Sequence, residues 1–513
     1  MKPEILAKHQ ANDEGRMTKQ TGAEVCAEDA RLEAFQKVSN LFETHLNCAT
    51  PQKSEDLWKE HLLIRECLDE VQKLQDTLAD TSSLLLDKRS KSSLEYFNKW
   101  AKQIGIQYDG VEIAQWTQRD FQLRARKEIK KDEPIVVVPH HAMISYDLVK
   151  KSSMLKKAVE LDPILKSMDN VALALFLSGH RLRSDSKWIA YLDMLPTSFS
   201  TPLYYSEEEL LALKPSPAFD EALTFYRTIS RQFCYFFLQF GKNDLYNSLR
   251  KRRQFTDAPP PFYNSPFTVE NFTFDLYRWA VCIISTRVNM VPSQTRKDKQ
   301  GNPVFVPVLI PVLDMANHEY VEATSVSYVA ETESGEISAS RDYKIGEVIT
   351  IDYGRRTNAD HLLYNGFVPA ENPSNSYKLK IALPRSDRLF RSKAKVLLDM
   401  DCVPWLGSNL YIFDIVLDEI PFGSTLVDFI LVFLSDDPMV QIEQDTKSHK
   451  KVASFLKTRF ALLERTYAMA KELKSPNSAA ILRLKAADLQ ILEKAREYCE
   501  EWEKVLAVEE KSS

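Results

Sequence analysis

The sequence contains no cysteine pair of the kind that holds a metal or forms a redox motif. Its seven cysteines are scattered over 513 residues, no two of them form a CxxC pair, and none stands at ligand spacing from a histidine. Closely spaced cysteines are what a structural zinc site or a secreted disulfide framework requires. We therefore expect a reducing compartment and no bound metal.

A long uncharged apolar run is also missing. The N-terminal residues MKPEILAKHQANDEGR lack the apolar core of a secretion signal, and the strongest apolar run, STLVDFILVFL, is short and contains Asp428. This run predicts a buried helix. We expect a cytoplasmic protein that does not bind membranes, with the nucleus left open as a second location.

Neither sign of charge dominates the chain. Lysine and arginine number 67 and aspartate and glutamate 72, which gives a net charge of −5. Such a balance produces no long-range attraction to nucleic acid or acidic lipid, so we expect neither as a partner. The short basic run Arg250–Arg253 allows an import signal or a partner contact, although most such runs are solvated surface.

The length and the hydrophobic pattern predict several domains. We expect a loose tail at 1–30, a helical N-terminal lobe at 31–108, a β domain at 109–354 with a helical insertion at about 142–292, and a helical domain at 375–507. VEIAQW, FQLRARKEI and PIVVVP predict strands, and EISASRDYKIGEVITIDYG predicts a hairpin. Two long helices, near 450–473 and 479–507, flank the break at Pro476.

Two stretches, LIPVLDMANH (309–318) and VITIDYGRRTNADHLLYNGF (348–367), carry polar residues at the ends of predicted strands. One strand ends in Asn317-His318 and the other in Tyr353-Gly354, which would place amide, imidazole and phenol groups around one small pocket. Two alternatives stay open: Tyr353-Gly354 closes a β hairpin, or Asn317-His318 is a turn former.

The order of these elements resembles SET-domain methyltransferases with a helical insert and a C-terminal helical substrate-binding domain, the group that contains the Rubisco large-subunit lysine methyltransferase. The resemblance covers about residues 55–500, and its most specific stretches are WIAYLDMLPTSFSTPLYY, YRWAVCIISTRVN, LIPVLDMANH, ITIDYGRRTNAD, KIALPRSDRLFRSKAKVL and ILRLKAADLQILEKA. It implies an α+β fold, in which a SET-domain β fold carries a helical insertion, a helical N-terminal lobe and an all-α C-terminal substrate-binding domain.

Within that group the sequence is most similar to enzymes that methylate a histidine of actin. The resemblance therefore implies S-adenosyl-L-methionine as cofactor, actin as protein substrate and a monomeric enzyme. Methyl transfer is an in-line displacement, so the site must align two reactants and hold a positive charge. By its place in the DYG motif, Tyr353 would surround the methyl group through weak CH···O contacts.

The same resemblance implies a set of cofactor-binding residues: Arg89, Phe121, Arg287, Asp314, Asn317, His318 and Tyr353. Arg287 could bind the cofactor carboxylate with two parallel hydrogen bonds, and its alternative role is a surface salt bridge. Ile351 and Arg356 would line the groove for the substrate peptide.

Asn289 is the residue that favours histidine as the acceptor. Imidazole, with an ordinary pKa of about 6.5, is largely neutral at pH 7, so it needs orientation more than deprotonation. A carboxamide that hydrogen-bonds the non-reacting ring nitrogen would fix the tautomer and the ring angle. The alternative is an asparagine that caps the end of the helix preceding Pro292.

Some positions depart from the group's pattern. Asp120-Phe121-Gln122 stands where a Gly-x-Gly element is expected, Arg119 replaces an acidic residue, and Leu313 replaces a tryptophan beside the retained Asp314. Two other functions therefore stay open: lysine methylation of a protein other than actin, and a cofactor-poor module that only binds a protein.

Overall fold

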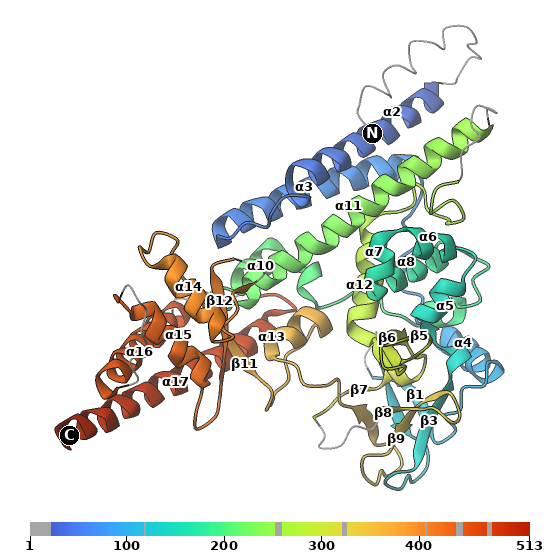
Figure 1. Ribbon diagram of the computed structural model, residues 1–513. Coiled ribbons are helices and arrows are strands. Elements are labelled where there is room, and N and C mark those ends of the chain that lie inside the picture. Colours follow the sequence, from blue (N-terminus) through green and yellow to red (C-terminus); the bar gives the residue numbers. More distant parts are fainter. Residues whose placement is uncertain are drawn as a thin grey trace. The chain divides into compact units, whose positions relative to one another are not determined.

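The computed structural model describes residues 22–116, 120–251, 259–320, 326–405, 408–437, 445–468 and 474–512. Most of the predicted loose tail, Arg119 and part of the basic run (Arg252 and Arg253) lie outside these residues. The chain divides into two compact units (Figure 1). The first unit consists of Met1–Thr197, Thr224–Asn317 and Ala323–Thr350, and the second unit of Ser198–Leu223, His318–Glu322 and Ile351–Ser513.

The first unit begins with helices, as the sequence predicts. Helix α2 (Gly22–Leu41) packs against α3 (Ser54–Leu78), and α4 (Lys91–Gln103) follows. Because α2 begins at Gly22, residues 22–30 are helical where a loose segment was expected. Helix α11 (Ala218–Lys251) is tied to α3 by a buried ion pair, in which Arg227 Nε lies 2.8 Å from Glu60 Oε2.

Before the C-terminal part, the short strands of the described residues form three sheets, with the strand orders β1-β2-β10-β7, β3-β9-β8 and β4-β6-β5. The strands are β1 (Val111–Gln115), β2 (Phe121–Ala125), β3 (Pro134–Pro139), β4 (Ile144–Ser145), β5 (Asn289–Lys297), β6 (Pro303–Leu309), β7 (Asn317–His318), β8 (Val326–Val329), β9 (Ser334–Ser338) and β10 (Val348–Ile351). The boundary between the units passes through β7 and β10.

The predicted hairpin between the strands on either side of Gly346 is wrong. Strand β9 pairs with β3 and β8, whereas β10 pairs with β2, so the two lie in different sheets. Alternating side chains indicate an extended segment with one buried face, but they do not identify its partner strand.

Helices of the predicted insertion lie between β4 and β5 in sequence: α5 (Tyr146–Lys151), α6 (Lys156–Leu161), α7 (Pro163–Ser167), α8 (Asp169–Arg181), α9 (Ile189–Leu192), α10 (Glu207–Ala212), α11 and α12 (Phe274–Arg287). Helix α8 is buried along almost its whole length and packs against α12. The Thr273 side chain caps α12 by accepting from Leu276 N–H, which explains where this helix starts.

The second unit is mainly helical, with α13 (Asn358–Asp360), the π-helix η5 (His361–Asn365), α14 (Phe390–Asp399), α15 (Ser424–Leu434), α16 (Thr446–Ala468) and α17 (Ser478–Ser512). Helices α16 and α17 pack together on either side of the predicted break, and α15 is the buried helix expected from STLVDFILVFL. Among the described residues, no helix is both long enough and apolar enough to span a bilayer.

One detail of the predicted fold needs correction, because this C-terminal part is not all-α. Strand β11 (Ser376–Ala382) pairs with β12 (Leu410–Val416) in an antiparallel sheet, with Leu379 opposite Phe413. The unit also contains Ser198–Leu223, which the sequence placed in the insertion. Lys485 Nζ on α17 donates to the carbonyl oxygen of Ala212 on α10 (3.2 Å), which attaches that segment to the last helix.

Candidate functional site

The backbone of LIPVLDMANH contains a strained turn. Val312, fully buried, has φ 71° and ψ −53°, and it leads into the 3-10 turn η4 (Leu313–Met315). A positive φ is costly for a β-branched residue and tends to persist where the surrounding structure holds it for a functional purpose. Here it turns the chain from β6 into η4 and delivers Asp314 to the interior.

Asp314 meets two donors inside the first unit. Nη1 of Arg287, the last residue of α12, donates to the carbonyl oxygen of Asp314 (2.8 Å) and lies 3.6 Å from its Oδ2. The hydroxyl of Tyr191, on α9, donates to the same Oδ2. The Asp314 side chain is 0% exposed, so its predicted role toward a cofactor would act through Arg287 rather than by direct contact.

The charge of Asp314 depends on these two contacts. Burial raises the pKa of this carboxyl, and Arg287 followed by Tyr191 opposes the rise. Burial also raises the pKa of Tyr191 well above its ordinary value, so the phenol is a donor at neutral pH. Arg287 retains 18% exposure of its side chain. The cluster therefore holds one partly accessible guanidinium in a fixed place.

Asn289 is the first residue of β5 and lies opposite Val308 of β6. The C-cap residue of α12 is Val288 and Asn289 follows it, so the alternative in which Asn289 caps the end of this helix stays open. Its Nδ2 lies 3.4 Å from the carbonyl oxygen of Arg287, which is a long hydrogen bond. Asn289 is thus two residues from the Arg287 contact, and its role toward a substrate stays a prediction.

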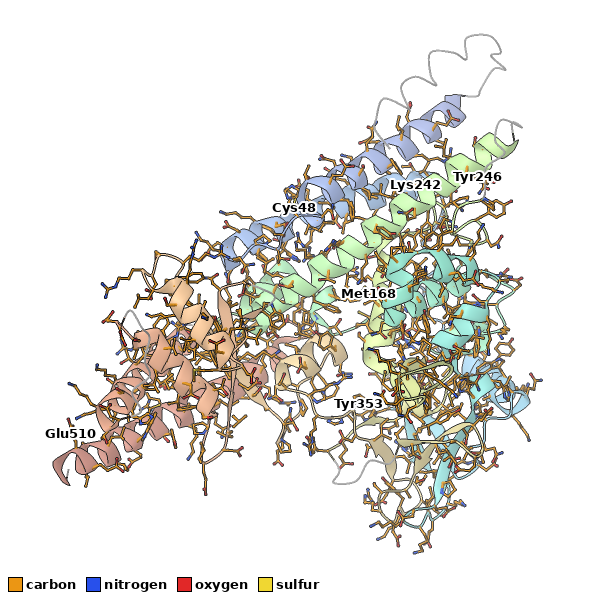
Figure 2. The ribbon with its side chains drawn as sticks, in the orientation of Figure 1. Cys48, Met168, Lys242, Tyr246, Tyr353 and Glu510 are labelled. Atoms are coloured by element: carbon orange, nitrogen blue, oxygen red, sulfur yellow. The ribbon has the colours of Figure 1, made fainter. Side chains whose placement is uncertain are left out.

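In the second unit, the ends of the two predicted strands meet. Glu319 N–H donates to the carbonyl oxygen of Ile351 (3.1 Å), and Tyr353 N–H donates to Nδ1 of His318 (3.2 Å); Tyr353 is labelled in Figure 2. An Nδ1 that accepts a hydrogen bond leaves the proton of a neutral imidazole on Nε2. Burial lowers the pKa of His318, which favours this neutral form. Imidazole and the DYG backbone are therefore brought together as the sequence predicts.

Other rings surround His318. Its centroid lies 5.1 Å from that of Tyr353, 4.9 Å from that of His361 and 5.8 Å from that of Phe367. Burial lowers the pKa of His361 to about 4, with further contributions from the nearby His318 and Arg356. His361 is a neutral, buried neighbour that sequence reasoning missed, although it lies in the stretch NADHLL shortly after the DYG motif.

The turn after Tyr353 does not close a hairpin. Gly354 has φ 90°, which favours glycine, and its N–H donates to Asp352 Oδ1 (2.8 Å). The chain then enters α13 through a capping box at Thr357, so the hairpin alternative for Tyr353-Gly354 is wrong. Arg356 Nη1 donates to Asn365 Oδ1 (2.7 Å), and Ile351 is 3% exposed. Their predicted places in a peptide groove stay predictions.

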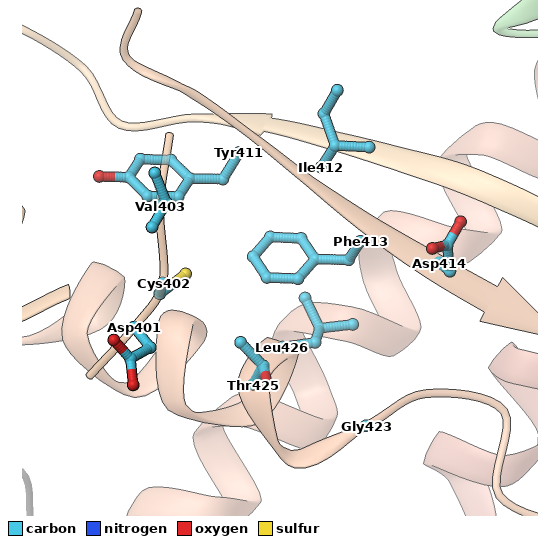
Figure 3. A pocket seen from close by; sticks show the side chains of 10 residues that line it. All are labelled: Asp401, Cys402, Val403, Tyr411, Ile412, Phe413, Asp414, Gly423, Thr425 and Leu426. Carbon is cyan, nitrogen blue, oxygen red and sulfur yellow. The ribbon is translucent and has the colours of Figure 1, made fainter. Parts of the chain in front are cut away.

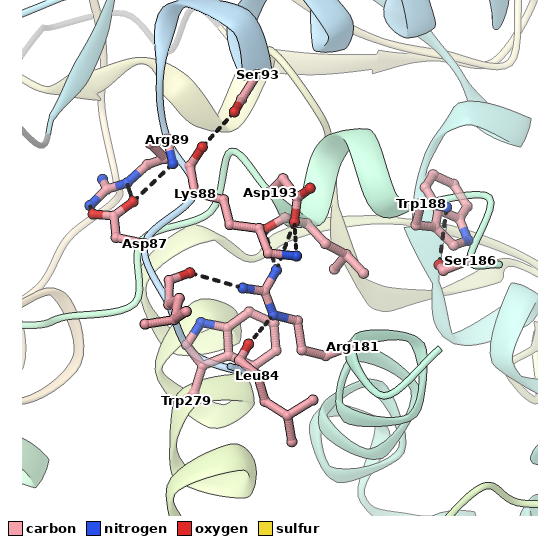
Figure 4. Close-up of polar contacts among 12 residues, drawn as sticks. Leu84, Asp87, Lys88, Arg89, Ser93, Arg181, Ser186, Trp188, Asp193 and Trp279 are labelled. Carbon is pink, nitrogen blue, oxygen red and sulfur yellow. Dashed lines mark hydrogen bonds and ion pairs between the residues drawn. The ribbon is translucent and has the colours of Figure 1, made fainter. Parts of the chain in front are cut away.

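In the part of the chain that is described, no hydrogen bond or ion pair joins Arg89 or Phe121 to these groups, and their cofactor roles also stay predictions. The Arg89 side chain is 5% exposed, and its guanidinium pairs with Asp87 through two hydrogen bonds of 2.9 and 2.6 Å (Figure 4). Phe121 is the first residue of β2, opposite Gln115, and β2 packs against η4. Among the positions that depart from the pattern of the resembling group, Leu313 and Gln122 are buried, so both side chains pack in the protein interior.

A second arginine network lies in the first unit. Arg181, at the end of α8, donates from Nε to the carbonyl oxygen of Leu84 (2.6 Å) and from Nη1 to Asp193 Oδ1 (3.2 Å) (Figure 4). Lys88 Nζ lies 3.4 Å from the same carboxylate oxygen. Arg181 thus fixes the segment that precedes Arg89. The sequence signal for it is an arginine that follows the apolar stretch of α8.

A groove of about 410 Å³ in the second unit offers different chemistry (Figure 3). It lies between β12, the turn at Asp401–Val403 and the start of α15, and Phe413 and Leu426 form its apolar wall. Burial raises the pKa of Cys402 to about 11, so the thiol is not a nucleophile at neutral pH. The charged groups among its lining residues are the carboxylates of Asp401 and Asp414.

The sequence pattern of the SET domain matches residues 120–354, which include both short motifs. The chain therefore carries a SET domain, and the predicted fold class is confirmed.

More specific similarities extend beyond this domain. The chain is 28% identical over 507 residues to the actin-histidine N-methyltransferase of Xenopus tropicalis, covering 93% of this chain and 81% of the relative. It is 29% identical over 506 residues to that of Danio rerio, covering 93% and 79%. A crystal structure of the SET domain of LSMT bound to lysine and AdoHcy matches with a TM-score of 0.59 and 20% identity, covering 82% of this chain and 93% of that one. A structure of Rubisco LSMT bound to AdoMet matches with a TM-score of 0.58.

Proposed function

We propose that this protein is an S-adenosyl-L-methionine-dependent protein-histidine N-methyltransferase and that its substrate is actin. The observation that carries the proposal is the similarity of 93% of the chain to relatives named actin-histidine N-methyltransferase. A shared SET domain alone supports methyl transfer without choosing between histidine and lysine. Similarity over 93% of the chain, which extends beyond residues 120–354, supports the narrower assignment.

Residues in each of the two units suit the proposed cofactor, which supplies an electrophilic methyl group on a sulfonium and carries an amino-acid carboxylate. Arg287 uses Nη1 for Asp314, and its Nε and Nη2 donate to no described residue, so they are available to a carboxylate. His318 Nε2 is buried without a partner among the described residues, and a ligand acceptor would satisfy it. Asn317, half-buried, adds an amide that both donates and accepts.

Asn289 would orient the acceptor imidazole. Because its Nδ2 donates to the carbonyl oxygen of Arg287, Oδ1 is the atom left to meet a substrate. An oxygen can only accept, so it would bind the ring nitrogen that carries the proton. The other ring nitrogen then keeps its lone pair for attack, and no general base is needed before the methyl transfer.

Tyr353 would stabilise the positive charge at the methyl group through its phenol oxygen. Its backbone is held by the hydrogen bond to His318 Nδ1 and by the adjacent Asp352–Gly354 turn. A fixed backbone restricts the ring, which is what a positioning role requires.

We also propose that the protein acts as a monomer in the cytoplasm, with the nucleus open as a second location.

The direct test incubates the purified full-length chain with actin and methyl-labelled cofactor, followed by digestion and mass spectrometry. Methylhistidine is the expected product. Methyl-lysine as the sole product would contradict the proposal and favour lysine methylation instead. An actin peptide in which lysine replaces the target histidine separates these two outcomes, and calorimetry that detects no cofactor binding would favour a binding module.

A further inference from the structure

In the first unit, Tyr191 contacts Asp314 and Asp314 contacts Arg287; Tyr191 and Asp314 are buried, and the Arg287 side chain is partly exposed. Tyr191 donates to Asp314 Oδ2, and the same oxygen lies 3.6 Å from Nη1 of Arg287. We propose that Tyr191 is a positioning residue: its phenol holds the Asp314 carboxylate so that Arg287 is fixed, and Tyr191 thereby controls how tightly the cofactor carboxylate is bound. This inference rests on the proposed function, in which Arg287 binds that carboxylate.

Tyr191 is a rigid donor. It is 0% exposed, and its ring packs beside two aromatic side chains of α4, with centroids 6.4 Å from Phe97 and 6.5 Å from Trp100. A ring packed in this way has little freedom to turn its hydroxyl elsewhere, and a buried hydroxyl without a partner is costly. The hydrogen bond to Asp314 is therefore a permanent part of the structure.

Asp314 needs this donor. Its Oδ1 is buried and has no hydrogen-bond partner among the described residues, so Oδ2 carries the interactions that hold the carboxylate. The donated N–H of Arg287 goes to the Asp314 carbonyl oxygen, and the guanidinium reaches Oδ2 only at ion-pair distance. Among the described residues, the phenol is the donor that fixes the carboxylate plane, and without it the carboxylate would keep the ion pair of 3.6 Å with Arg287.

The pKa of Asp314 links the role of Tyr191 to the pH dependence of cofactor binding. The charged and titratable groups that act on it are Arg287 on α12 and Tyr191 on α9, and both oppose the rise in its pKa caused by burial. Removing the Tyr191 hydroxyl lets that pKa rise further, so Asp314 becomes neutral at a higher pH. A neutral carboxyl attracts Arg287 less, and cofactor binding should then begin to weaken at a higher pH.

The experiment measures binding of S-adenosyl-L-methionine to full-length Tyr191→Phe by calorimetry over a pH series. At neutral pH we expect binding about tenfold weaker than in the parent protein, the size of a lost hydrogen bond to a charged group. We also expect a shift in the acid limb of the affinity-against-pH profile, the range in which cofactor binding weakens as the pH falls. This limb should move to higher pH. Tyr146→Phe is the matched control, because this buried tyrosine donates only to the carbonyl oxygen of Leu165 (3.2 Å) and should leave binding unchanged.

Equal affinity and an unshifted acid limb in Tyr191→Phe would overturn the inference while leaving the proposed function intact. If the parent protein itself binds no cofactor, both fail. Should Tyr191→Phe not fold, Asp314→Asn replaces it, because the amide keeps the shape of the carboxylate and removes its titration. Loss of the acid limb in Asp314→Asn supports the inference, and an unchanged limb contradicts it.

Discussion

Replacing Asn289 with alanine should lower turnover on a histidine peptide by at least about tenfold. A neutral hydrogen bond contributes about 0.5–1.5 kcal/mol, or about two- to tenfold in rate, and the lost orientation of the ring adds to this. The cost in stability should stay below about 0.5 kcal/mol, because the side-chain hydrogen bond that Asn289 makes among the described residues, to the carbonyl oxygen of Arg287, is long at 3.4 Å.

The assay is steady-state methylation of an actin peptide, with kcat and the KM for the cofactor measured separately and unfolding followed in urea. Asn302→Ala is the matched control, because that exposed asparagine follows β5 and its Nδ2 also lies 3.4 Å from an acceptor, Asp298 Oδ2. Unchanged kcat in Asn289→Ala, or an equal loss in both variants, would refute the orienting role.

Three further predictions concern other parts of the molecule. His318→Ala should destabilise the protein by about 2 kcal/mol in urea and weaken cofactor binding, because Tyr353 N–H loses its acceptor; unchanged values of both would contradict this. Asp488, which accepts from the Tyr467 hydroxyl, has its pKa raised by burial to about 7, so the folded chain binds this proton more tightly than the unfolded chain. Stability should therefore fall as the pH rises from about 4 to about 7, and Asp488→Asn should flatten that slope in urea titrations; parallel pH profiles would show the assignment is wrong. Arg181→Met should cost about 3–5 kcal/mol in the same assay, because it leaves the Asp193 carboxylate and the Leu84 carbonyl without this donor, and a cost under about 1 kcal/mol would count against it.

Much of the fold follows from hydrophobic periodicity. The 3.6-residue pattern predicts α8 and α12, and proline with its polar neighbours predicts the break between α16 and α17. Pairing of strands does not follow, since β9 and β10 have suitable patterns for each other and nevertheless join different sheets. The alternation in SYKLKIA was present, but its place among helices concealed strand β11.

The features of the candidate site also differ in whether the sequence could predict them. Tyr353 and His318 could be predicted because both lie in short motifs that fold locally into strand ends. The contact between Tyr191 and Asp314 could not, because it joins residues separated by 123 positions and depends on tertiary packing. Val312 has a backbone conformation that a β-branched residue avoids, so local propensity gives the opposite expectation.

Mass spectrometry of actin from cells that lack this protein tests the central claim most directly. The proposed function predicts that methylation of the actin histidine is lost and returns when the parent chain, but not Asn289→Ala, is restored. Actin that keeps its full methylhistidine content in the absence of the protein would contradict it.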